Sequence, residues 1–195
     1  MPKKLKLILI PALMLFNSCG LFETRSVEPP TVIRSTFIQP TSPDIVLTNL
    51  NYAVAEKNLD NYMRCLVDTN FSLRKYRFFP DAFSQSSFPV FNNWNLNNER
   101  SYFSNLISFT EPGSSSNLFP DNIIISTSID SAILDMNYIL IFNHNRQNVA
   151  KETKGKLRFV MSADSRGLWS IHSWYDFVVN NNDTTWSVLK ANFVN

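Results

Sequence analysis

Few residues of this 195-residue chain combine a type and a spacing that could support acid–base or metal chemistry. The chain has two histidines, His144 and His172, and Asp176 lies four residues after the second one. If this segment is a strand, His172 and Asp176 share a face but lie about 13 Å apart, too far for a proton relay or a shared metal ion. Because a protein metal site needs three or four converging ligands, we expect neither a metal site nor a cofactor.

Asp68 is a carboxylate that could lie beside a pocket, because the segment CLVDTNF leads toward Arg74 and Tyr76. An aspartate at such a junction is more typical of a turn or a helix cap, and we favour that interpretation. The chain also contains no Gly-rich phosphate loop, no nucleophile elbow and no usefully spaced pair of carboxylates. In the favoured interpretation, the sequence therefore predicts no catalytic residue.

Cys19 follows a segment that is typical of a secretion signal. Three of the first six residues are lysines, and the apolar run that follows, Leu7 to Phe16, is far too short to span a bilayer as a helix. The next residues, FNSCG, resemble a bacterial lipobox, the motif in which a cysteine is acylated and becomes the mature N-terminus. We expect Cys19 to carry lipid, and several acyl chains together hold a protein stably on a membrane.

This assignment sets the expected domain organisation and location. Residues 1–18 would be the lipoprotein signal peptide, residues 19–43 a lipidated N-terminus with a proline-rich tether, and residues 44–195 one folded domain. No aspartate retention signal follows the cysteine, since Gly20 and Leu21 come next. We therefore expect a bacterial cell-envelope protein, lipid-anchored to the outer membrane.

The charge balance argues against a nucleic-acid partner. Residues 1–18 hold three of the 18 basic residues and no acid, so the remainder carries 15 basic and 16 acidic residues. A strong electrostatic partner such as nucleic acid requires an excess of basic residues, and we expect none to bind.

Hydrophobic periodicity predicts helices first and strands later. The helices expected from the 3.6-residue spacing of apolar residues cover 43–58, 59–67 and 97–109, and the last segment, with Trp186, Leu189 and Phe193, could form a short docking helix. Strands are expected at 71–80, 122–129, 131–143, 155–163 and 168–179. Helices followed by antiparallel strands indicate an α+β fold with the helices on one face of a curved sheet.

The register of the two final strands decides which side chains face the helices. A turn at Asp164–Gly167 with a left-handed glycine pairs Asp164 with Leu168. Strict alternation from this turn then places Tyr175 toward the helices and Asp176 outward, opposite Lys156. The other register would bury Asp176, and an unpaired buried carboxylate costs several kcal/mol. We therefore expect the glycine-turn register.

The order of elements and the segment RGLWSIHSWYDF, with its Gly-x-Trp-x-Ile pattern, resemble the NTF2-like superfamily, also called SnoaL-like. The resemblance covers about residues 44–180. It implies a cone, in which a curved antiparallel sheet carries two or three helices on its concave face. The segment NNDTTWSVLKANF is similar to tails of NTF2-like bacterial lipoproteins of unknown function. Members of the superfamily include isomerases and dehydratases as well as non-catalytic binding proteins, so the fold alone does not select a function.

The expected inward side chains of the cone are mostly apolar, and none has a pKa near neutrality. They suit a small apolar ligand oriented by a few hydroxyl groups. The candidate pocket residues are Trp94, Tyr138, Leu140, Leu157, Phe159, Ser173 and Tyr175.

The convex face of the sheet is a second candidate site, because apolar residues are expected to gather on it. The resemblance implies that two copies could pair through this face. The candidate interface residues are Ile139, Ile141, Arg158 and Trp174. An alternative is that the C-terminal tail covers the same patch.

The sequence thus favours a non-catalytic, lipid-anchored NTF2-like domain that binds a small apolar ligand or a protein partner. The alternative is an isomerase or dehydratase in which Asp68 or His172 acts as base and Tyr138 or Tyr175 as proton donor.

Overall fold

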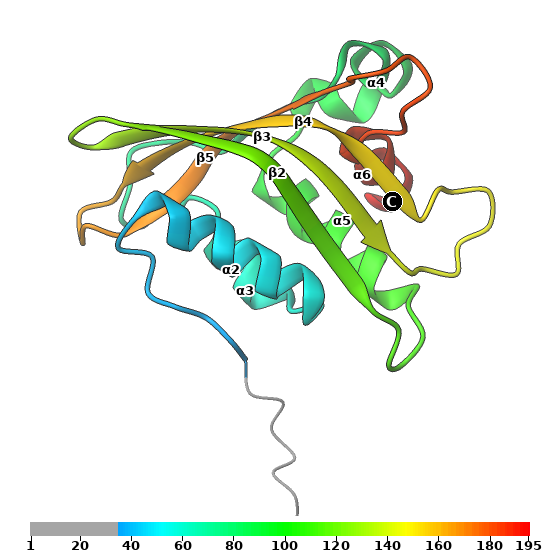
Figure 1. Cartoon of the computed structure of the whole chain (residues 1–195), viewed down its shortest axis with the longest axis horizontal. Helices are drawn as coiled ribbons and strands as arrows, with labels where there is room; N and C mark the ends of the chain where they lie inside the picture. Colours follow the sequence, from blue (N-terminus) through cyan, green and yellow to red (C-terminus); the bar gives the residue numbers. More distant parts are fainter. Residues whose placement is uncertain (1–34) are drawn as a thin grey trace, which may run out of the picture. The chain divides into compact units, whose positions relative to one another are not determined.

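The computed structural model describes residues 35–195, and the expected signal peptide and Cys19 lie outside this part of the chain. The sheet curves over the helices α2, α3 and α5, with α6 near one end (Figure 1). The elements in chain order are α2 (Pro43–Ala55), α3 (Leu59–Arg64), β1 (Arg77–Phe79), α4 (Ala82–Ser87), the 3-10 helix η2 (Pro89–Asn93), α5 (Leu96–Ser108), β2 (Ser116–Thr127), β3 (Ser131–Phe142), β4 (Glu152–Ala163), β5 (Trp169–Phe177) and α6 (Trp186–Phe193). Among residues 35–195, no helix is long and apolar enough to cross a bilayer.

The sheet has the strand order β1-β5-β4-β3-β2 and is open at both edges. Four strands pair antiparallel as expected, whereas β1 pairs parallel to β5, with Arg77 opposite Ser173. The expectation of a wholly antiparallel sheet is therefore wrong at one edge. The curved α+β fold with helices on the concave face is confirmed.

The helix α2 follows directly from its sequence. Pro43 occupies the first helical position, where its missing N–H costs nothing, and Asp44 lies in the first turn near the positive end of the helix dipole. The residues on the inner face repeat every three or four positions and are buried. They are Val46, Leu47, Leu50, Ala53 and Val54.

Residues 35–43 belong to the folded domain and do not form part of a free tether. The side chain of Asn49 binds the backbone of Ile38 twice, with its Oδ1 accepting at 2.8 Å and its Nδ2 donating at 2.6 Å. The carbonyl of Pro40 accepts a hydrogen bond of 2.7 Å from the backbone N–H of Trp169, at the start of β5. The compact unit of the described chain, Ser35–Asn195, therefore includes the last residues of the segment that was expected to be a tether.

The turn between β4 and β5 has the expected geometry. Gly167 has a φ of +76°, which a residue with a side chain rarely adopts. The N–H of Asp164 donates to the carbonyl of Leu168 at 2.9 Å. Next to the turn, Ala163 faces Trp169, as the glycine-turn register requires.

A β-bulge at His172 then inverts the alternation along β5. Met161 still pairs with Ile171, but Val160 pairs with Ser173, so His172 has no partner on β4. Trp174 and Asp176 consequently point inward, which contradicts the expectation that both face outward. Ser173 and Tyr175 point outward, which contradicts the expectation that both line the cone.

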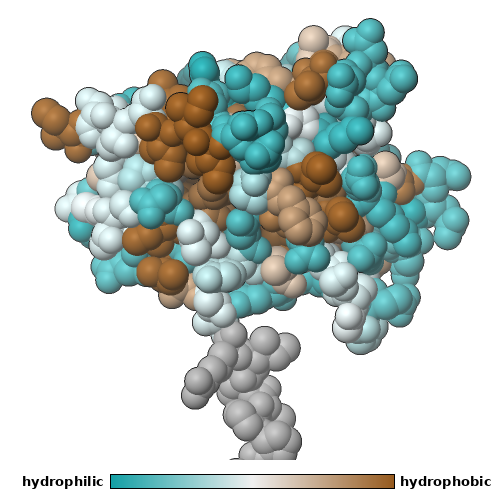
Figure 2. Space-filling model, in the orientation of Figure 1, coloured by the Kyte–Doolittle hydropathy of each residue, from teal (hydrophilic) through white to brown (hydrophobic). Residues whose placement is uncertain are grey.

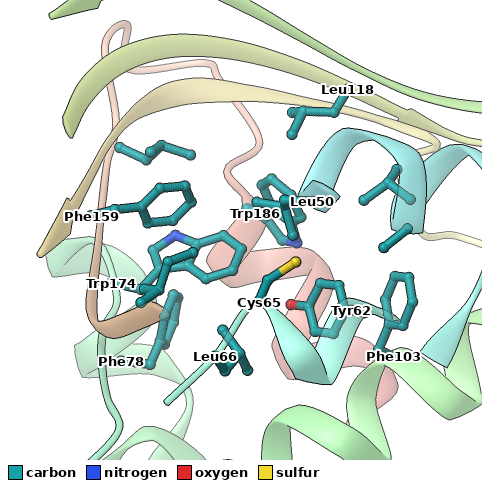
Figure 3. Close-up of a cluster of buried hydrophobic side chains, with 14 of the residues drawn as sticks. Leu50, Tyr62, Cys65, Leu66, Phe78, Phe103, Leu118, Phe159, Trp174 and Trp186 are labelled. Carbon is teal, nitrogen blue, oxygen red and sulfur yellow. The ribbon is translucent and has the colours of Figure 1, made fainter. Parts of the chain in front are cut away.

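Because the side chain of Trp174 points inward, it lies in the hydrophobic core. Its ring meets Phe78, Phe159 and Trp186 edge-on, with centroid separations of 5.9, 4.8 and 4.7 Å (Figure 3). Cys65, a free thiol, is buried in the same cluster. Aromatic side chains of this size bury large apolar areas and prefer edge-to-face contacts. The interior of the cone is therefore packed with the protein's own side chains.

Candidate functional site

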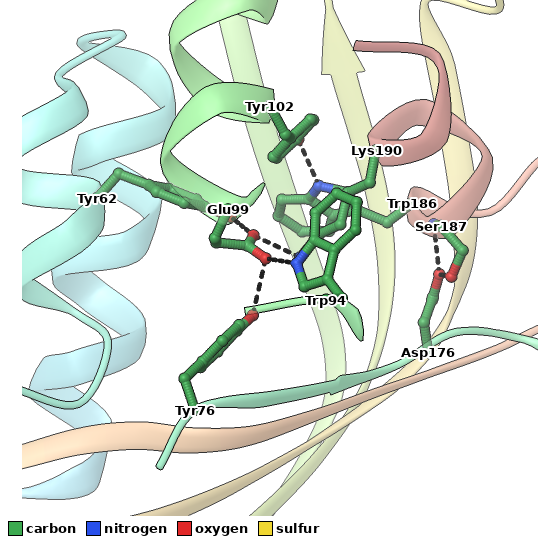
Figure 4. A network of polar contacts seen from close by, with 9 residues as sticks. All are labelled: Tyr62, Tyr76, Trp94, Glu99, Tyr102, Asp176, Trp186, Ser187 and Lys190. Carbon is green, nitrogen blue, oxygen red and sulfur yellow. Dashed lines mark hydrogen bonds and ion pairs between the residues drawn. The ribbon is translucent and has the colours of Figure 1, made fainter. Parts of the chain in front are cut away.

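The interior of the cone contains a buried carboxylate, that of Glu99, in the first turn of α5. Glu99 has no exposed surface. Tyr62 and Lys190 donate to its Oε1, both at 2.5 Å, while Tyr76 at 2.9 Å and Trp94 at 2.6 Å donate to its Oε2 (Figure 4). A carboxylate has about four lone-pair positions. All of them are used here by side chains from four different parts of the chain.

The backbone of α5 holds Glu99 in this position. Asn95 caps the helix, since its side chain accepts from the N–H of Asn97, and Asn98 completes a capping box by accepting from the N–H of Asn95. Glu99 also lies three and four residues before Tyr102 and Phe103, which are fully buried. It therefore occupies the apolar stripe of the helix, and α5 directs the carboxylate into the core.

Lys190 of α6 supplies the positive charge next to Glu99 and is itself fully buried. Its ammonium lies 3.7 Å from the ring centroid of Trp174 and 3.9 Å from that of Phe78, so it also makes cation–π contacts. Burial lowers the pKa of Lys190 to about 8, and the negative charge of Glu99 opposes this shift. At neutral pH the lysine remains mostly protonated and forms an ion pair with Glu99.

The tyrosines around Glu99 are held in their neutral form. Burial and the nearby carboxylate raise the pKa of both Tyr62 and Tyr76 well above the usual value. A tyrosine that keeps its proton at all ordinary pH values can donate to the carboxylate, but it is a poor proton acceptor.

Asp176 forms a second buried carboxylate at the inner face of β5. Its Oδ1 accepts from the hydroxyl of Tyr138 at 2.8 Å, and its Oδ2 accepts from the N–H and the hydroxyl of Ser187 at 2.7 and 2.5 Å. The Tyr138 oxygen in turn accepts from the N–H of Trp186 at 2.7 Å. Burial raises the pKa of Asp176, against the effect of these hydrogen bonds. The donors explain why an inward carboxylate is tolerated here.

Asp81, the capping residue of α4, also forms hydrogen bonds with the start of α6. Its Oδ2 accepts from the hydroxyls of Thr185 and Ser84, both at 2.6 Å, and its N–H donates to Ser187 at 3.3 Å. Burial acts to raise the pKa of Asp81, but the hydrogen bonds from Ser84 and Thr185 outweigh it and hold the pKa below its usual value. Three carboxylates, those of Asp81, Glu99 and Asp176, thus hold α6 in place.

The buried acids do not line the surface cavities described for residues 35–195. Three of these cavities have volumes of about 450, 490 and 570 Å³, and Glu99, Asp176 and Lys190 line none of the three. The helix α6 contributes Trp186 and Lys190 to the interior, and both side chains are fully buried.

Five of the expected pocket residues lie in the interior, as predicted. Tyr138, Leu140, Leu157, Phe159 and Trp94 are all buried. They belong to one hydrophobic core cluster, in which the ring of Tyr138 lies against that of Trp186 in α6 with a centroid separation of 5.6 Å. A role for these side chains in ligand binding stays a prediction.

Ser173 and Tyr175 lie on the convex face because of the bulge. The ring of Tyr175 stacks on that of Phe79 with a centroid separation of 4.2 Å. Trp174, expected at a convex interface, is fully buried in the core. Ile139, Ile141 and Arg158 face outward as expected, and Arg158 forms a two-pronged ion pair with Asp135, with both N–O distances at 2.9 Å. An interface role for these three residues stays a prediction.

Asp68 and His172, the bases proposed from sequence, lie outside the interior. Asp68 accepts from the N–H of Asn70 at 2.9 Å, which is the turn geometry favoured above. His172 sits in the bulge, where burial and the charge of Arg74 lower its pKa. His144 is buried away from Asp68 and His172, and its Nε2 lies 3.1 Å from the carbonyl oxygen of Ala150. Within residues 35–195, no group of three His, Cys, Asp or Glu residues could hold a metal ion.

The sequence carries a signal for the buried pair Glu99 and Lys190, because each charged residue lies on the apolar stripe of its helix. Lys190 lies four residues after Trp186 and one residue after Leu189, so it falls on the apolar stripe of α6. A charged residue on an apolar stripe must find a partner when the stripe is buried. Two such residues of opposite charge, on two amphipathic helices, predict a buried ion pair.

Comparison with solved structures identifies the architecture. A protein from Novosphingobium aromaticivorans, provisionally named as a scytalone dehydratase, matches with a TM-score of 0.54 and 10% identity over 72% of this chain and 84% of that chain. The chain has an NTF2-like fold. A provisionally named dehydratase of the NTF2-like family from Streptomyces avermitilis matches with a TM-score of 0.51 and 9% identity, over 70% of this chain and 93% of that chain. An NTF2-like protein from Cytophaga hutchinsonii matches with a TM-score of 0.50 and 10% identity, over 69% and 93% of the two chains.

No family model matches the sequence, and no curated protein sequence matches it. At about a tenth of identical residues, the structural neighbours share the NTF2-like fold with this chain. They do not transfer an activity to it.

Proposed function

We propose that this protein is a lipid-anchored component of the bacterial cell envelope, at the outer membrane, whose NTF2-like domain is non-catalytic and pairs with a second copy through its convex face. The observation that carries the non-catalytic part is the position of α6. This helix fills the interior with Trp186 and Lys190, both fully buried, and engages the carboxylates of Glu99 and Asp176. A domain whose interior is occupied in this way acts through its surface, so we favour a protein partner over a small apolar ligand.

The convex face has the composition of a contact surface. Phe119, Ile133 and Ile139 expose 51, 40 and 42% of their surface there, and Phe119 lies directly opposite Ile139 on the neighbouring strand. Apolar (brown) side chains also gather over the β2–β3 part of the surface in Figure 2. Contiguous apolar patches of this kind mark interaction sites, and a two-fold dimer uses the same patch twice.

The dimer is tested by measuring the molar mass of the purified protein by light scattering after size exclusion, across a range of concentrations. We expect a dimer, and we expect Ile139→Glu to give a monomer because two buried glutamates would face each other. The matched control is Phe83→Glu, which places the same charge on an exposed apolar residue of α4. A monomeric parent protein, or an Ile139→Glu variant that stays dimeric, would contradict the proposal.

The anchor is tested separately by metabolic labelling with a radioactive fatty acid. The parent chain should incorporate label, and Cys19→Ser should not, because the thioether forms on the cysteine sulfur. Equal labelling of the two chains would remove the anchor from the proposal and leave the dimer untouched.

A proton-transfer enzyme of the isomerase or dehydratase type is the alternative, and one observation favours it. Glu99, with Tyr62 and Tyr76 as neighbours, has the composition of an acid–base site, and two of the structural neighbours are named as dehydratases. Substrate could reach Glu99 only if α6 opened. Hydrogen exchange decides between the two: amides of residues 186–193 should exchange as slowly as those of β4 in a non-catalytic domain, and much faster in an enzyme that opens.

A further inference from the structure

The loop between α3 and β1 carries a fully exposed leucine beside three cations. The side chain of Leu73 is fully exposed to solvent. Arg74, Lys75 and Arg77 follow it in the sequence and are also exposed. Leu73 and these three cations are called the Leu73 patch below. Together with His172 and Ser173 they border a surface hollow of about 490 Å³. No carboxylate of residues 35–195 lies within salt-bridge distance of the three cations.

The carboxylates that lie nearby are already engaged. Asp164 and Asp68 both face Arg166, at 2.6 and 3.9 Å, in the turn between β4 and β5. The loop and this turn are joined, because the N–H of Ser165 donates to the carbonyl of Phe71 at 3.1 Å and the Arg166 guanidinium stacks on the Phe71 ring. Within residues 35–195, no carboxylate therefore neutralises the cations of the Leu73 patch, which can meet an external negative charge.

The position of the Leu73 patch points to one kind of partner. It lies at the end of the sheet where β5 begins, which is also where the carbonyl of Pro40 accepts from the N–H of Trp169 (Figure 1). An exposed apolar side chain flanked by lysine and arginine is the arrangement that binds an anionic bilayer: the cations meet the phosphates and the apolar side chain enters the acyl boundary. A small acidic ligand without an apolar surface would leave Leu73 exposed, whereas a bilayer covers it.

We propose that the Leu73 patch docks on an anionic phospholipid surface and that it orients the domain with this end toward the bilayer. This contact is independent of any lipid on Cys19 and of the convex-face dimer. It uses the phosphate groups of the lipid headgroups, which Arg74, Lys75 and Arg77 would contact, with Leu73 inserted among the first carbons of the chains.

The test places a polarity-sensitive fluorophore at position 73. The full-length chain with Cys19→Ser and Leu73→Cys is labelled on the exposed thiol, since Cys65 is buried and burial raises the pKa of its thiol. We expect a blue shift on vesicles that contain phosphatidylglycerol and none on pure phosphatidylcholine vesicles. The matched control carries the fluorophore at Phe83→Cys, exposed on α4 at the other end of the sheet, and should not shift.

A second variant tests the cations. In the chain labelled at position 73, Arg74, Lys75 and Arg77 are replaced by glutamine. The apparent affinity for anionic vesicles, measured from the blue shift, should fall by about 100-fold, since each cation contributes roughly a fivefold factor near an anionic surface. Circular dichroism checks that the variant is folded.

Several outcomes would overturn the proposal. The first is the absence of a blue shift at position 73 on anionic vesicles, and the second is an equal shift at positions 73 and 83. The third is an apparent affinity for these vesicles that the triple substitution leaves unchanged. A site for free phosphate would bind inorganic phosphate without vesicles and give no blue shift. Because the chain tested lacks the acylated cysteine, failure here is distinct from failure of the lipid-labelling experiment.

Discussion

At the scale of single residues, the unusual feature is a lysine and a glutamate that are both fully buried. Taking two charges out of water is expensive, and their attraction compensates only when both are also well hydrogen-bonded. Glu99 meets this condition through Tyr62, Tyr76 and Trp94. Lys190 donates one hydrogen bond, to Glu99, and its ammonium also makes cation–π contacts with Phe78 and Trp174. The pair is therefore sensitive to the loss of either partner.

We expect Lys190→Met to lower the free energy of unfolding by about 3–5 kcal/mol, because the carboxyl group of Glu99 would be left buried without its ionic partner. Urea unfolding measures the loss. The matched control is Lys154→Met: the ammonium of Lys154 lies 3.3 Å from Asp183 at the surface, and its loss should cost at most about 1 kcal/mol. Equal losses of unfolding free energy in the two variants would show that the buried ion pair contributes no more to stability than the surface pair.

Asp176 predicts a particular dependence on pH. A carboxyl whose pKa is higher in the folded than in the unfolded chain stabilises the fold below its unfolded pKa, near 3.8, and this stabilisation is lost as the pH rises through the folded value. The unfolding free energy of the parent chain should therefore fall relative to that of Asp176→Asn as the pH is raised from about 3 toward neutrality. Urea unfolding at a series of pH values checks the sign, and a rising difference would contradict the inward, desolvated position of Asp176.

At the scale of elements, the β-bulge in β5 decides what the cone contains. One unpaired residue, His172, moves Trp174 and Asp176 from the convex to the concave side. The two side chains then meet their partners: Phe159 and Trp186 for the indole, Tyr138 and Ser187 for the carboxylate. The bulge is thus required by the long-range contacts of the second half of β5.

Deleting His172 should retain the native fold, because Ser173 and Trp174 keep their partners Val160 and Phe159 and the pairing with β4 then runs without a break. Deleting both His172 and Ser173 should abolish the fold, because continuous pairing would then turn Trp174 and Asp176 to the solvent side. Near-ultraviolet circular dichroism, which reports the packing of the tryptophans, distinguishes the two variants. A native spectrum for the double deletion would contradict the inward position of Trp174.

The elements that sequence predicts well are those with a local signal. Proline at the first position and a regular apolar stripe predict α2, and Gly167 predicts the β4–β5 turn. The sequence does not indicate the early start of β2 at Ser116, because Pro120 is typical of a break, although proline is tolerated on an edge strand. The sequence signal for the helix α4 is a single capping residue, Asp81, which is too little to predict a helix.

The contents of the site could not be predicted from the local pattern. The rule that a carboxylate avoids the interior fails for Asp176 because its donors, Tyr138 and Ser187, lie 38 and 11 residues away. Strict alternation fails because the bulge leaves no mark in the sequence. The pairing of Glu99 with Lys190 spans 91 residues, and the packing of two helices was needed to bring them together.

At the scale of the whole molecule, the interior of the NTF2-like fold is packed with the protein's own side chains. Trp186 lies at the centre, in contact with Trp174 and Tyr138, and its Nε1 donates to the hydroxyl of Tyr102 at 2.7 Å. If this indole stands in for a ligand, an external molecule of the same shape should be able to replace it.

We expect Trp186→Gly to lose about 3–5 kcal/mol of unfolding free energy, because it leaves a large cavity in the core. Added indole should raise the melting temperature of this variant by filling the cavity, and it should leave the parent chain unchanged. Thermal denaturation with and without indole measures both effects. A rise in the parent chain would instead indicate that the interior has room for a ligand, as the small-ligand hypothesis requires.

The late position of α6 along the chain affects how the protein is made. Ribosomes build the polypeptide from its amino end, so Glu99 is synthesised 91 residues before Lys190, whereas Asp176 precedes Ser187 by only 11 residues. Until Lys190 emerges, the Glu99 carboxylate has its tyrosine and tryptophan donors but no cationic partner, and closing the core around it is unfavourable. The domain should therefore complete its folding only after the ribosome has synthesised α6.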